Sequence, residues 1–480
     1  MDDVMVVGAG PTGLVLACGL LRQGVRVRVV DRAAGPATTS RALILHARGV
    51  QILDRLGALG DLPDRVIRIR GISVHVNGDR VAKVALDPAR AATPMIVSQA
   101  EIEAALRRRL AELGGEIEWN TEVTGARQDE DGVTIGLNDV ATTRAGWLAG
   151  CDGAHSRVRA LARVPFPGVP LGERFLLADV HATWDADRHT TAAWLHRDGL
   201  LLAFPLPGAP DLWRLIAGLQ PGTGDVPDVP AGFSQIFRQR TGGDGPAIRA
   251  ADWTSVFRIH RRLADDYRHG RLLLAGDAAH INSPVGGQGM NIGMADAENL
   301  AWRLALVAGG QADAALLDTY RDERRPAAAN ALNGTTALTR VLLTANPVFR
   351  TVRDRLASVA GVPALQRLAL DRASQLGMSY RSGPLSPGGV LPRRGLRPGD
   401  RVPDQACLRA DGSRTRLYPE LGRGFVLLGE PDPGVRERLG DRVSVLSPVN
   451  GRGHGMLVRP DGHLAFREGL ADMLRKGRLR

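Results

Sequence analysis

The sequence predicts an α/β protein that combines a domain built on a βαβ unit, an inserted antiparallel sheet and a small C-terminal α/β domain. Three observations predict this fold class. A strand, a glycine-rich turn, a helix and a second strand open the chain, and short alternating apolar segments fill residues 164–269. Strands alternate with short helices again after residue 400. At about 150 residues per domain, a chain of 480 residues has room for all three units.

The opening βαβ unit has the pattern of a dinucleotide site. An apolar strand leads into Gly8-Ala9-Gly10-Pro11-Thr12-Gly13, a helix follows, and the second strand ends at Asp31. Gly8 permits the tight turn, Gly10 leaves room for a pyrophosphate, and Gly13 lets helix and strand pack closely. The helix N-terminus offers N–H donors to phosphates, and a carboxylate at Asp31 accepts hydrogen bonds from ribose hydroxyls. The combination predicts a bound dinucleotide.

The rest of this domain is expected in two pieces, residues 1–163 and 270–381, of which the second carries a helical extension. Periodicity and glycine stops predict further elements in both pieces. We expect helices at Ser40–Leu56, Gln99–Leu113, Met294–Leu306 and Asp313–Leu376, and strands at Val4–Val7, Val25–Val30, Ile117–Val123, Gly132–Leu137, Trp147–Ala149 and Arg271–Ala275.

Residues 164–269 have a different texture, in which alternating segments are separated by Pro and Gly. This pattern predicts an antiparallel sheet that binds the substrate. Its strands are expected at Phe175–His181, Ala192–His196, Leu200–Pro205 and Trp213–Leu219. Trp194, Leu202, Phe204, Trp213 and Leu215 are candidates for a substrate pocket. Because strand residues of this kind more often form the core of a sheet, we do not count them among the site residues.

A second glycine-rich stretch follows the strand at Arg271–Ala275. It begins with Gly276-Asp277 and continues to Gly286-Gly287-Gln288-Gly289-Met290-Asn291, where a helix opens. A carboxylate at a strand end can hold a ribityl hydroxyl, and N–H groups at a helix N-terminus can stabilise an anionic reduced flavin. The alternative is a loop without a ligand, but this alternative does not explain why so many positions of the stretch are glycine.

These motifs resemble those of the FAD-dependent aromatic hydroxylases, the single-component class A flavoprotein monooxygenases. The segment Asp152-Gly153-Ala154-His155-Ser156-Arg157-Val158-Arg159 matches the family's DGxxSxxR, and Gly276-Asp277 with Pro284 matches its GD-x6-P. Order and spacing agree across about residues 1–345. The C-terminal region, residues 382–480, comprises a linker and a domain similar to the thioredoxin-like domain of the polyketide- and antibiotic-modifying branch. It has no CxxC, so we expect no redox role for it.

The resemblance implies a Rossmann-like FAD-binding domain and a role for each matching residue. Asp31 would bind the adenosine ribose, and Asp152 and Arg159 would serve both FAD and a transiently bound NADPH. The other implied contacts are those of Thr12, Gly13 and Arg32 near the ribose, Arg41 near the pyrophosphate or flavin, Gln99, the Val123 backbone near adenine, and Asp277, Gly289, Met290 and Asn291 around the ribityl chain and flavin.

The chemistry that the resemblance implies belongs mostly to the cofactor. NADPH or NADH would reduce FAD, O2 would add to give a C4a-hydroperoxyflavin, and this species would hydroxylate a polyketide-type aromatic ring. No side chain is predicted to be catalytic, and His46, His181, His196, His260 and His280 are each expected to be structural. The alternatives are Baeyer–Villiger oxidation, rifamycin-type inactivation of an antibiotic, an oxygen-independent flavin reductase, and a flavin-binding sensor without enzymatic activity.

Composition excludes several other classes. The net charge is +11, but its arginines are dispersed rather than gathered in a patch, so we expect no nucleic-acid partner. Three scattered cysteines, Cys18, Cys151 and Cys407, predict neither disulfides nor a metal site. The sequence shows no secretory signal and no apolar run of membrane-spanning length, so we expect a cytoplasmic protein, a monomer or a homodimer, without a membrane partner.

Overall fold

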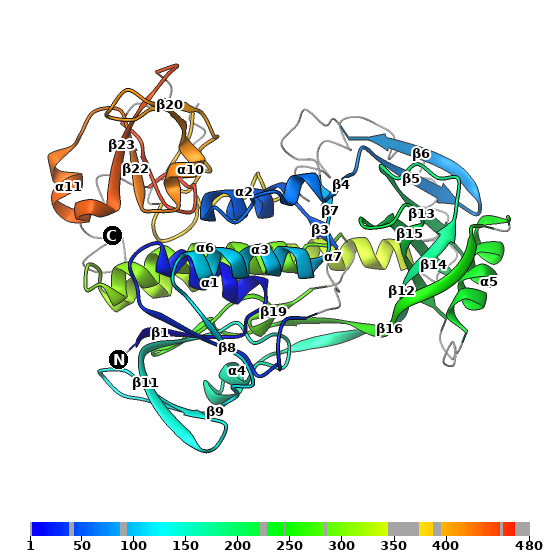
Figure 1. Cartoon of the computed structure of the whole chain (residues 1–480), viewed down its shortest axis with the longest axis horizontal. Coiled ribbons are helices and arrows are strands. Elements are labelled where there is room, and N and C mark those ends of the chain that lie inside the picture. Colours follow the sequence, from blue (N-terminus) through cyan, green and yellow to red (C-terminus); the bar gives the residue numbers. More distant parts are fainter. Residues whose placement is uncertain are drawn as a thin grey trace.

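The computed structural model describes residues 2–37, 43–86, 94–220, 228–243, 245–282, 286–343, 374–386, 395–451 and 455–465. It is an α/β fold with two large sheets and a smaller C-terminal one, arranged around a central group of helices (Figure 1). In the described ranges, no helix is both long enough and apolar enough to cross a membrane.

The first large sheet carries the predicted βαβ unit. Its strand order is β17-β18-β11-β1-β2-β8, and the β9–β10 hairpin is attached to β11. The neighbours β18, β11, β1, β2 and β8 run parallel. Val4, Met5 and Val6 of β1 are fully buried, because helices or strands cover both faces of this central strand. The strands are β1 Asp2–Val7, β2 Val27–Val30, β8 Ile117–Glu118, β9 Val123–Gln128, β10 Val133–Leu137, β11 Ala141–Gly150, β17 Arg268–His269 and β18 Leu272–Leu274.

Three helices pack beside this sheet and against one another: α1 (Pro11–Leu21), α3 (Gln99–Glu112) and α6 (Gly289–Ala308). The contact between α1 and α6 is close, since a Cβ on Gly19 would lie 2.9 Å from the Ala301 Cβ. Because Gly19 and Ala301 are 282 positions apart, this packing joins segments that are distant in the sequence. The short helix α4 (Arg157–Leu161) follows β11.

The expected helix at 40–56 is shorter than predicted. In the structure α2 covers Ala47–Leu56, and Ile44–Leu45 forms β3, which pairs with β7 (Met95–Ile96). β7 also pairs with β4 (Ile67–Arg68), and the short helix η1 (Leu62–Asp64) lies between α2 and β4. The pairing of Ile44 with Ile96 satisfies backbone groups that a helix would have used, so a long-range contact decides the conformation here.

The second large sheet has the order β19-β16-β12-β15-β14-β13-β5-β6. The four strands expected within 164–269 are present, and every neighbouring pair is antiparallel except β13 with β5. Two strands come from residues 71–85, which the sequence pattern did not assign to this sheet. The strands are β5 Gly71–Val76, β6 Asp79–Ala85, β12 Gly168–Thr183, β13 Thr190–His196, β14 Gly199–Pro205, β15 Leu212–Leu219, β16 Ala247–Leu263 and β19 His280–Ile281.

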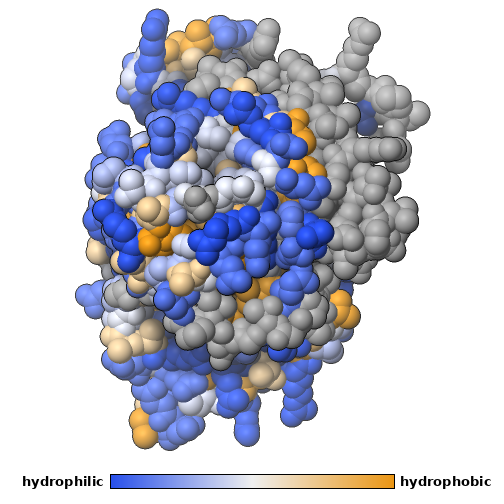
Figure 2. Space-filling view, turned by 90° about the vertical axis from the view of Figure 1, so that its right-hand side faces the viewer, coloured by the Kyte–Doolittle hydropathy of each residue, from blue (hydrophilic) through white to orange (hydrophobic). Residues whose placement is uncertain are grey.

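The two faces of the second sheet have different neighbours. Helix α5 (Val229–Thr241), which the pattern did not predict, covers one face and packs Phe233 and Phe237 against Trp194, Trp213 and Leu215. These three pocket candidates therefore belong to the core beneath α5. Figure 2 shows the outside of this region, where hydrophilic residues dominate and hydrophobic ones form only small separate areas.

Leu202 and Phe204 alternate along β14 with Leu201 and Ala203, which pack in the core beneath α5. Because successive residues of a strand point to opposite faces, Leu202 and Phe204 lie on the face away from α5. Helix α7 (Asp318–Leu343) approaches β14 and β16, and Figure 1 shows it reaching the sheet from the side of the first domain.

The C-terminal region forms a sheet of order β21-β20-β23-β22-β24. The alternation of strands and short helices expected after residue 400 is present, and Leu464 forms a single bridge with Val458. Part of the predicted linker, residues 387–394, lies outside the described residues. The remaining elements are β20 Ala406–Leu408, β21 Arg414–Arg416, β22 Phe425–Leu428, β23 Val443–Pro448, β24 Leu457–Val458, α10 Leu417–Leu421, α11 Pro433–Leu439, η2 Gly276–Ala278, η3 Ala314–Leu317 and η4 Gly440–Arg442.

Buried charges join this region to the helices. Arg459 donates to both carboxylate oxygens of Glu323 on α7, at 2.8 and 2.9 Å, and Asp461 accepts from Asn299 on α6 at 3.1 Å. Arg459, Asp461 and Glu323 are each at least 97% buried. Breaking such a network leaves an uncompensated buried charge and typically costs about 3–5 kcal/mol, so the C-terminal region is a fixed part of the fold.

Candidate functional site

A cavity of about 230 Å³ opens at the carboxyl ends of β1, β2 and β11. In open parallel sheets, ligands bind at this edge. Six of the predicted site residues line the cavity, together with several residues that are close to them in the sequence. The lining comprises Val7, Gly8, Gly10, Asp31, Arg32, Thr121, Glu122, Val123, Cys151, Asp152, Gly153, His155 and Arg157.

The three motif glycines have different surroundings. Gly8 has φ +104°, and a Cβ there would overlap the carbonyl of Cys151. A Cβ on Gly13 would overlap the carbonyl oxygen of Gly8 itself. A Cβ on Gly10, in contrast, would meet no heavy atom within 4 Å. Gly8 and Gly13 are therefore required by the fold, whereas Gly10 borders open space on the cavity side, where a ligand backbone could approach.

Asp31 orders the loop that it faces. Its Oδ2 accepts a hydrogen bond from the backbone N–H of Ala9 at 2.7 Å, and its Oδ1 accepts from the N–H of Ala33 at 2.8 Å. A carboxylate has about four acceptor positions, so both oxygens can still accept hydrogen bonds from a ribose. Asp31 thus fixes the glycine loop and also presents acceptor capacity to the cavity.

Asp152 and Arg159 perform structural tasks in the DGxxSxxR segment. Asp152 accepts hydrogen bonds from the Ser156 hydroxyl at 2.6 Å and from the N–H of Arg157 at 2.6 Å, so it caps helix α4. Arg159 donates to the carbonyl oxygen of Ala278 at 2.8 Å, and its guanidinium lies 3.9 Å from the centre of the Phe166 ring. Arg159 thereby ties this segment to the Gly276-Asp277 turn.

Thr12 connects the first glycine loop to the second glycine-rich stretch. A Cβ on Gly276 or on Gly293 would lie 2.5 Å from the Thr12 Oγ1, so the Thr12 side chain fills the space between these two glycines. Only the backbone of Thr12 is left to face a ligand. Asp277 follows Gly276 in the same turn and is exposed. The two stretches are therefore in direct contact.

The Asn291 side chain holds the turn that precedes α6. Its Oδ1 accepts from the N–H of His46 at 2.9 Å, and its Nδ2 donates to the carbonyls of Ile44 and Gly287 at 2.9 and 3.0 Å. His46 contacts the same turn through Nε2 and the carbonyl oxygen of Gly286, at 2.8 Å. Burial lowers the pKa of His46, so this side chain is neutral near pH 7.

The Asn291 side chain is thus occupied by protein groups, which leaves backbone groups as the donors at the start of α6. The first four N–H groups of a helix have no acceptor within the helix. In α6 these include the N–H groups of Gly289, Met290 and Asn291, because the hydrogen-bonding ladder starts with Ile292 donating to Gln288. This arrangement suits an anionic or electron-rich ligand atom.

A buried ion network beneath this turn was not found from the sequence. Asp296 on α6 accepts from His280 at 2.7 Å, from Arg324 at 2.7 Å and from the N–H of Gly276 at 3.1 Å. Burial alone would raise the pKa of Asp296, but Arg324 and His280 hold it below the usual value. His280 is therefore a structural partner of Asp296, as predicted. The sequence signal was a carboxylate, Asp296, flanked by alanines in a largely apolar helix.

Two further predicted residues occupy the cavity's surroundings, and one cannot be placed. Val123 begins β9 and lines the cavity, and Gln99 begins α3, where it donates to Glu103 at 2.8 Å. Arg41 lies outside the described residues, as does Pro284 of the GD-x6-P motif. Cavity residues that we did not predict, such as His155 and Arg157, belong to the DGxxSxxR segment, so that motif already contained their signal.

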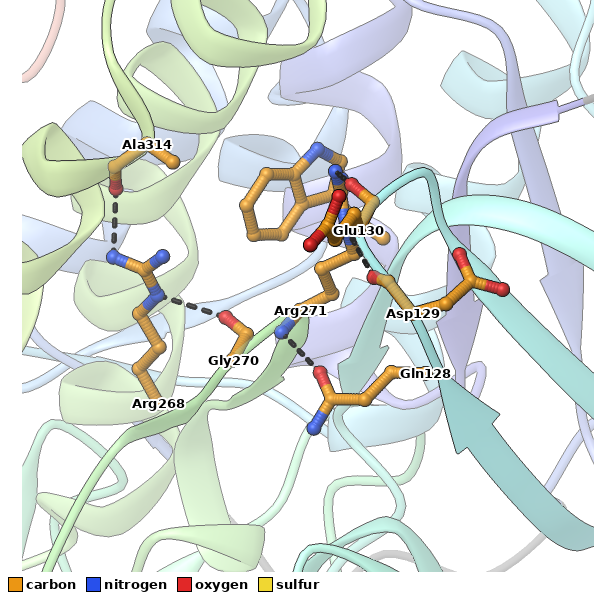
Figure 3. A pocket seen from close by; sticks show the side chains of 8 residues that line it. Gln128, Asp129, Glu130, Arg268, Gly270, Arg271 and Ala314 are labelled. Carbon is orange, nitrogen blue, oxygen red and sulfur yellow. Dashed lines mark hydrogen bonds between the residues drawn. The ribbon is translucent and has the colours of Figure 1, made fainter.

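A second hollow lies at the opposite end of the first sheet and is shown in Figure 3. Arg268 donates there to the carbonyl oxygens of Gly270 and Ala314, and the Arg271 N–H donates to Gln128. The guanidinium groups of both arginines lie within 5.7 Å of the Trp147 ring centre. Because these polar groups already bind one another, the hollow is not a candidate for the predicted dinucleotide.

The face of the second sheet away from α5 carries a polar group among apolar ones. Arg214 is 2% exposed and binds both carboxylate oxygens of Asp179, at 2.6 and 2.7 Å. Its guanidinium also lies 5.5 Å from the Trp253 ring centre. Together with Leu202 and Phe204, this pair gives the face both apolar and charged character.

The features of the cavity fit an FAD molecule. The adenosine end of a dinucleotide needs acceptors for ribose hydroxyls and a side-chain-free approach for the pyrophosphate, which Asp31 and Gly10 provide. The isoalloxazine needs N–H donors near its electron-rich edge, and the start of α6 provides them. The Thr12 contact with Gly276 and Gly293 brings the first glycine loop next to the turn and helix α6.

Parallel strands, a glycine loop and a second sheet beside them define a dinucleotide-binding enzyme. A family model described as "FAD binding domain" matches residues 1–335, and the chain belongs to this family. A 12-dehydrotetracycline 5-monooxygenase/anhydrotetracycline 6-monooxygenase of Streptomyces rimosus is 33% identical over 98% of both chains. A rifampicin monooxygenase of Streptomyces venezuelae is 34% identical over 97% of this chain and 95% of its own.

A solved ternary complex of aklavinone-11 hydroxylase with FAD and aklavinone has a TM-score of 0.77 and 28% identity, covering 97% of this chain and 95% of that one. The protein is accordingly an FAD-dependent monooxygenase of the class A flavoprotein aromatic hydroxylases. The family resemblance read from the sequence motifs is thereby confirmed.

Proposed function

We propose that this monooxygenase uses FAD and NADPH to hydroxylate a polyketide-type aromatic compound. The observation that carries the proposal is the contact of Thr12 with Gly276 and Gly293, which joins two loops suited to the two ends of one FAD molecule. The tetracycline and rifampicin monooxygenases that resemble the chain along nearly its whole length support the substrate class.

In this proposal the chain's own residues bind and orient the cofactor. Asp31 accepts hydrogen bonds from the adenosine ribose, and Gly10 admits the pyrophosphate next to the start of α1. The N–H groups of Gly289, Met290 and Asn291 face the flavin, and Asp277 holds the ribityl chain. Arg41, Arg32, Gln99 and Val123 complete the cofactor site. FAD supplies the redox and oxygen chemistry when bound.

The substrate is proposed to bind against the face of the second sheet that points away from α5. Leu202 and Phe204 provide apolar area for an aromatic ring system. The Arg214–Asp179 pair lies on the same face and adds polar, charged groups beside this apolar area. This arrangement excludes water from one side of the ring while the flavin site occupies the other.

The test uses the full chain purified without added cofactor. We expect a yellow protein that releases FAD on denaturation and that consumes NADPH faster in the presence of aromatic polyketides. NADH in place of NADPH tests the choice of electron donor. A colourless protein that gains no stability from added FAD would refute the cofactor assignment.

A rifamycin-type substrate is a second candidate, favoured by the rifampicin monooxygenase relative. The same assay separates the candidates, because NADPH consumption with rifampicin but not with simple polyketide aromatics would support antibiotic modification. The mass and structure of the product distinguish hydroxylation from Baeyer–Villiger insertion. Turnover that persists without oxygen would instead indicate a flavin reductase.

A further inference from the structure

Three arginines, two of them buried and one partly buried, meet where α2, α6 and the C-terminal region come together. Arg48 and Arg55 on α2 are 3% and 1% exposed, and Arg401 reaches the same place from the C-terminal region, where its guanidinium lies 5.2 Å from the Tyr418 ring centre. The Arg55 guanidinium lies at the same distance from this ring. Burying several like charges together is expensive unless opposite charges compensate them.

The described part of the chain supplies one carboxylate to these three cations. Glu298 accepts from Arg48 at 2.7 Å and from the Arg55 Nε at 2.7 Å. The neighbouring carboxylates do not make up the difference, because Glu323 and Asp461 are paired with Arg303 and Arg459. Burial, together with the charges of Arg48 and Arg55, lowers the pKa of Arg401 to about 9. The local excess is therefore positive.

Several of the guanidinium N–H groups also have no acceptor among the described residues. These are the Arg48 Nη1, the Arg55 Nη1 and the Arg401 Nε, all shielded from solvent. An unsatisfied buried donor of a charged group costs more free energy than one of a neutral group. Such groups in a native fold call for a bound partner.

The space for such a partner lies at Gly462. A Cβ on Gly462 would be 3.8 Å from the Arg48 Nη1, 3.9 Å from the Arg55 Nη1 and 3.8 Å from a Leu421 methyl group. The backbone of Gly462 is already satisfied, since its N–H donates to Arg459 and its carbonyl accepts from Val402. The bare Cα therefore borders a small space that two unpartnered cationic donors flank.

We propose that a small monovalent inorganic anion, with the chemistry of chloride, binds at Gly462 between Arg48 and Arg55. The anion accepts the two free Nη1–H groups and offsets part of the positive excess beside Glu298. Because Arg48 and Arg55 lie on α2 and Gly462 lies in the C-terminal region, the anion joins the two units. The proposal does not depend on the substrate or on the reaction.

The first experiment measures unfolding of the full-length protein in sodium chloride and in sodium gluconate at equal ionic strength. A ligand that binds only the folded state lowers the unfolding constant by a factor of 1 + [L]/Kd. This factor is about 11 when the ligand concentration is ten times Kd. We expect a saturable stabilisation by chloride that gluconate does not give. Equal unfolding midpoints in the two salts would overturn the proposal.

A pair of variants assigns the effect to this place. Gly462→Ala puts a methyl group into the proposed site at φ +81°, and Gly412→Ala carries the same backbone strain at φ +80° in an exposed turn with open space around it. We expect Gly462→Ala to lose the chloride-dependent stabilisation and Gly412→Ala to retain it. Retention in both variants, or loss in both, would place the effect elsewhere and overturn the proposal.

A crystallographic measurement covers the case in which Gly462→Ala does not fold. Crystals of the unaltered protein soaked in sodium bromide should show an anomalous peak beside Gly462, within contact of Arg48 and Arg55. A map without a peak at this position, although bromide binds elsewhere, would overturn the proposal.

Discussion

The two large sheets present different chemical groups to their proposed ligands. At the edge of the first sheet they include the glycine loop with its backbone N–H groups and the carboxylates of Asp31, Glu122 and Asp152. On the second sheet they are side chains, with Leu202 and Phe204 beside the Arg214–Asp179 pair. A backbone site accepts one invariant cofactor, whereas a side-chain surface can change with each substrate. This difference supports our proposal that the first sheet binds the cofactor and the second selects the substrate.

The largest effect is expected from the glycines of the first loop. Gly13→Ala should abolish folding or lower the stability by more than about 4 kcal/mol, because its Cβ would overlap the Gly8 carbonyl. Gly10→Ala should leave the unfolding midpoint of the FAD-free protein unchanged but weaken FAD binding at least tenfold. Thermal unfolding and a fluorescence titration with FAD measure the two effects. Equal behaviour of the two variants would contradict the assigned roles.

The next effect concerns the buried network under the second glycine turn. Asp296→Asn should lower the stability by about 3–5 kcal/mol, because Arg324 and His280 lose their shared carboxylate. FAD retention should fall as well, since the Gly276 turn loses an acceptor. Asp322→Asn on α7 is a suitable control, because its carboxylate is exposed and pairs only with Arg321 among the described residues. An unaltered denaturation midpoint for Asp296→Asn would contradict this role.

The two faces of the second sheet provide a matched pair of leucines. Leu215→Ala should cost about 2–5 kcal/mol, because Leu215 is fully buried in the core beneath α5, and KM for the substrate should stay the same. Leu202→Ala should cost less stability and raise KM several-fold. Urea unfolding and steady-state kinetics with an identified substrate decide between them. If KM changed in Leu215→Ala but not in Leu202→Ala, the substrate would bind on the face beneath α5, and the proposed binding face would be refuted.

The smallest effect is a pH dependence at the edge of the second sheet. Asp211 and Asp252 each lie 3.1 Å from His181 and raise its pKa above the usual value of 6.5. The pairing therefore stabilises the folded protein below about pH 6.5. This contribution is lost as the pH rises through the raised pKa of His181. Unfolding midpoints between pH 5 and 9 should fall slightly in the parent protein and less in His181→Asn. An identical pH profile in the variant would refute the assignment.

The sequence predicted the parts of the fold that local patterns encode. The loop from Gly8 to Gly13, the strand before Asp31 and four of the eight strands of the second sheet were expected where they occur. Residues 71–85 were missed because β5 joins the second sheet through a parallel pairing with β13, more than 100 residues away. The same reason explains Ile44–Leu45, whose strand conformation depends on the partner strand β7.

For the site, the motifs indicated which residues gather but not which atoms serve the ligand. Thr12, Asn291 and Arg159 were expected to contact the cofactor, yet their side chains bind protein groups and hold the loops together. The Asp296 network could not be inferred, because a buried carboxylate is recognised only when its partners, Arg324 and His280, are known.

The pairing of Arg459 with Glu323 has a consequence for folding of the chain during its synthesis. These residues are 136 positions apart, so Glu323 leaves the ribosome long before its partner. Until then Glu323 has Arg303 and Asn299 of α6 as partners but lacks its second cation, so the buried network around it is incomplete. Ribosome-bound chains that stop before residue 459 should accordingly engage chaperones longer than the finished polypeptide does.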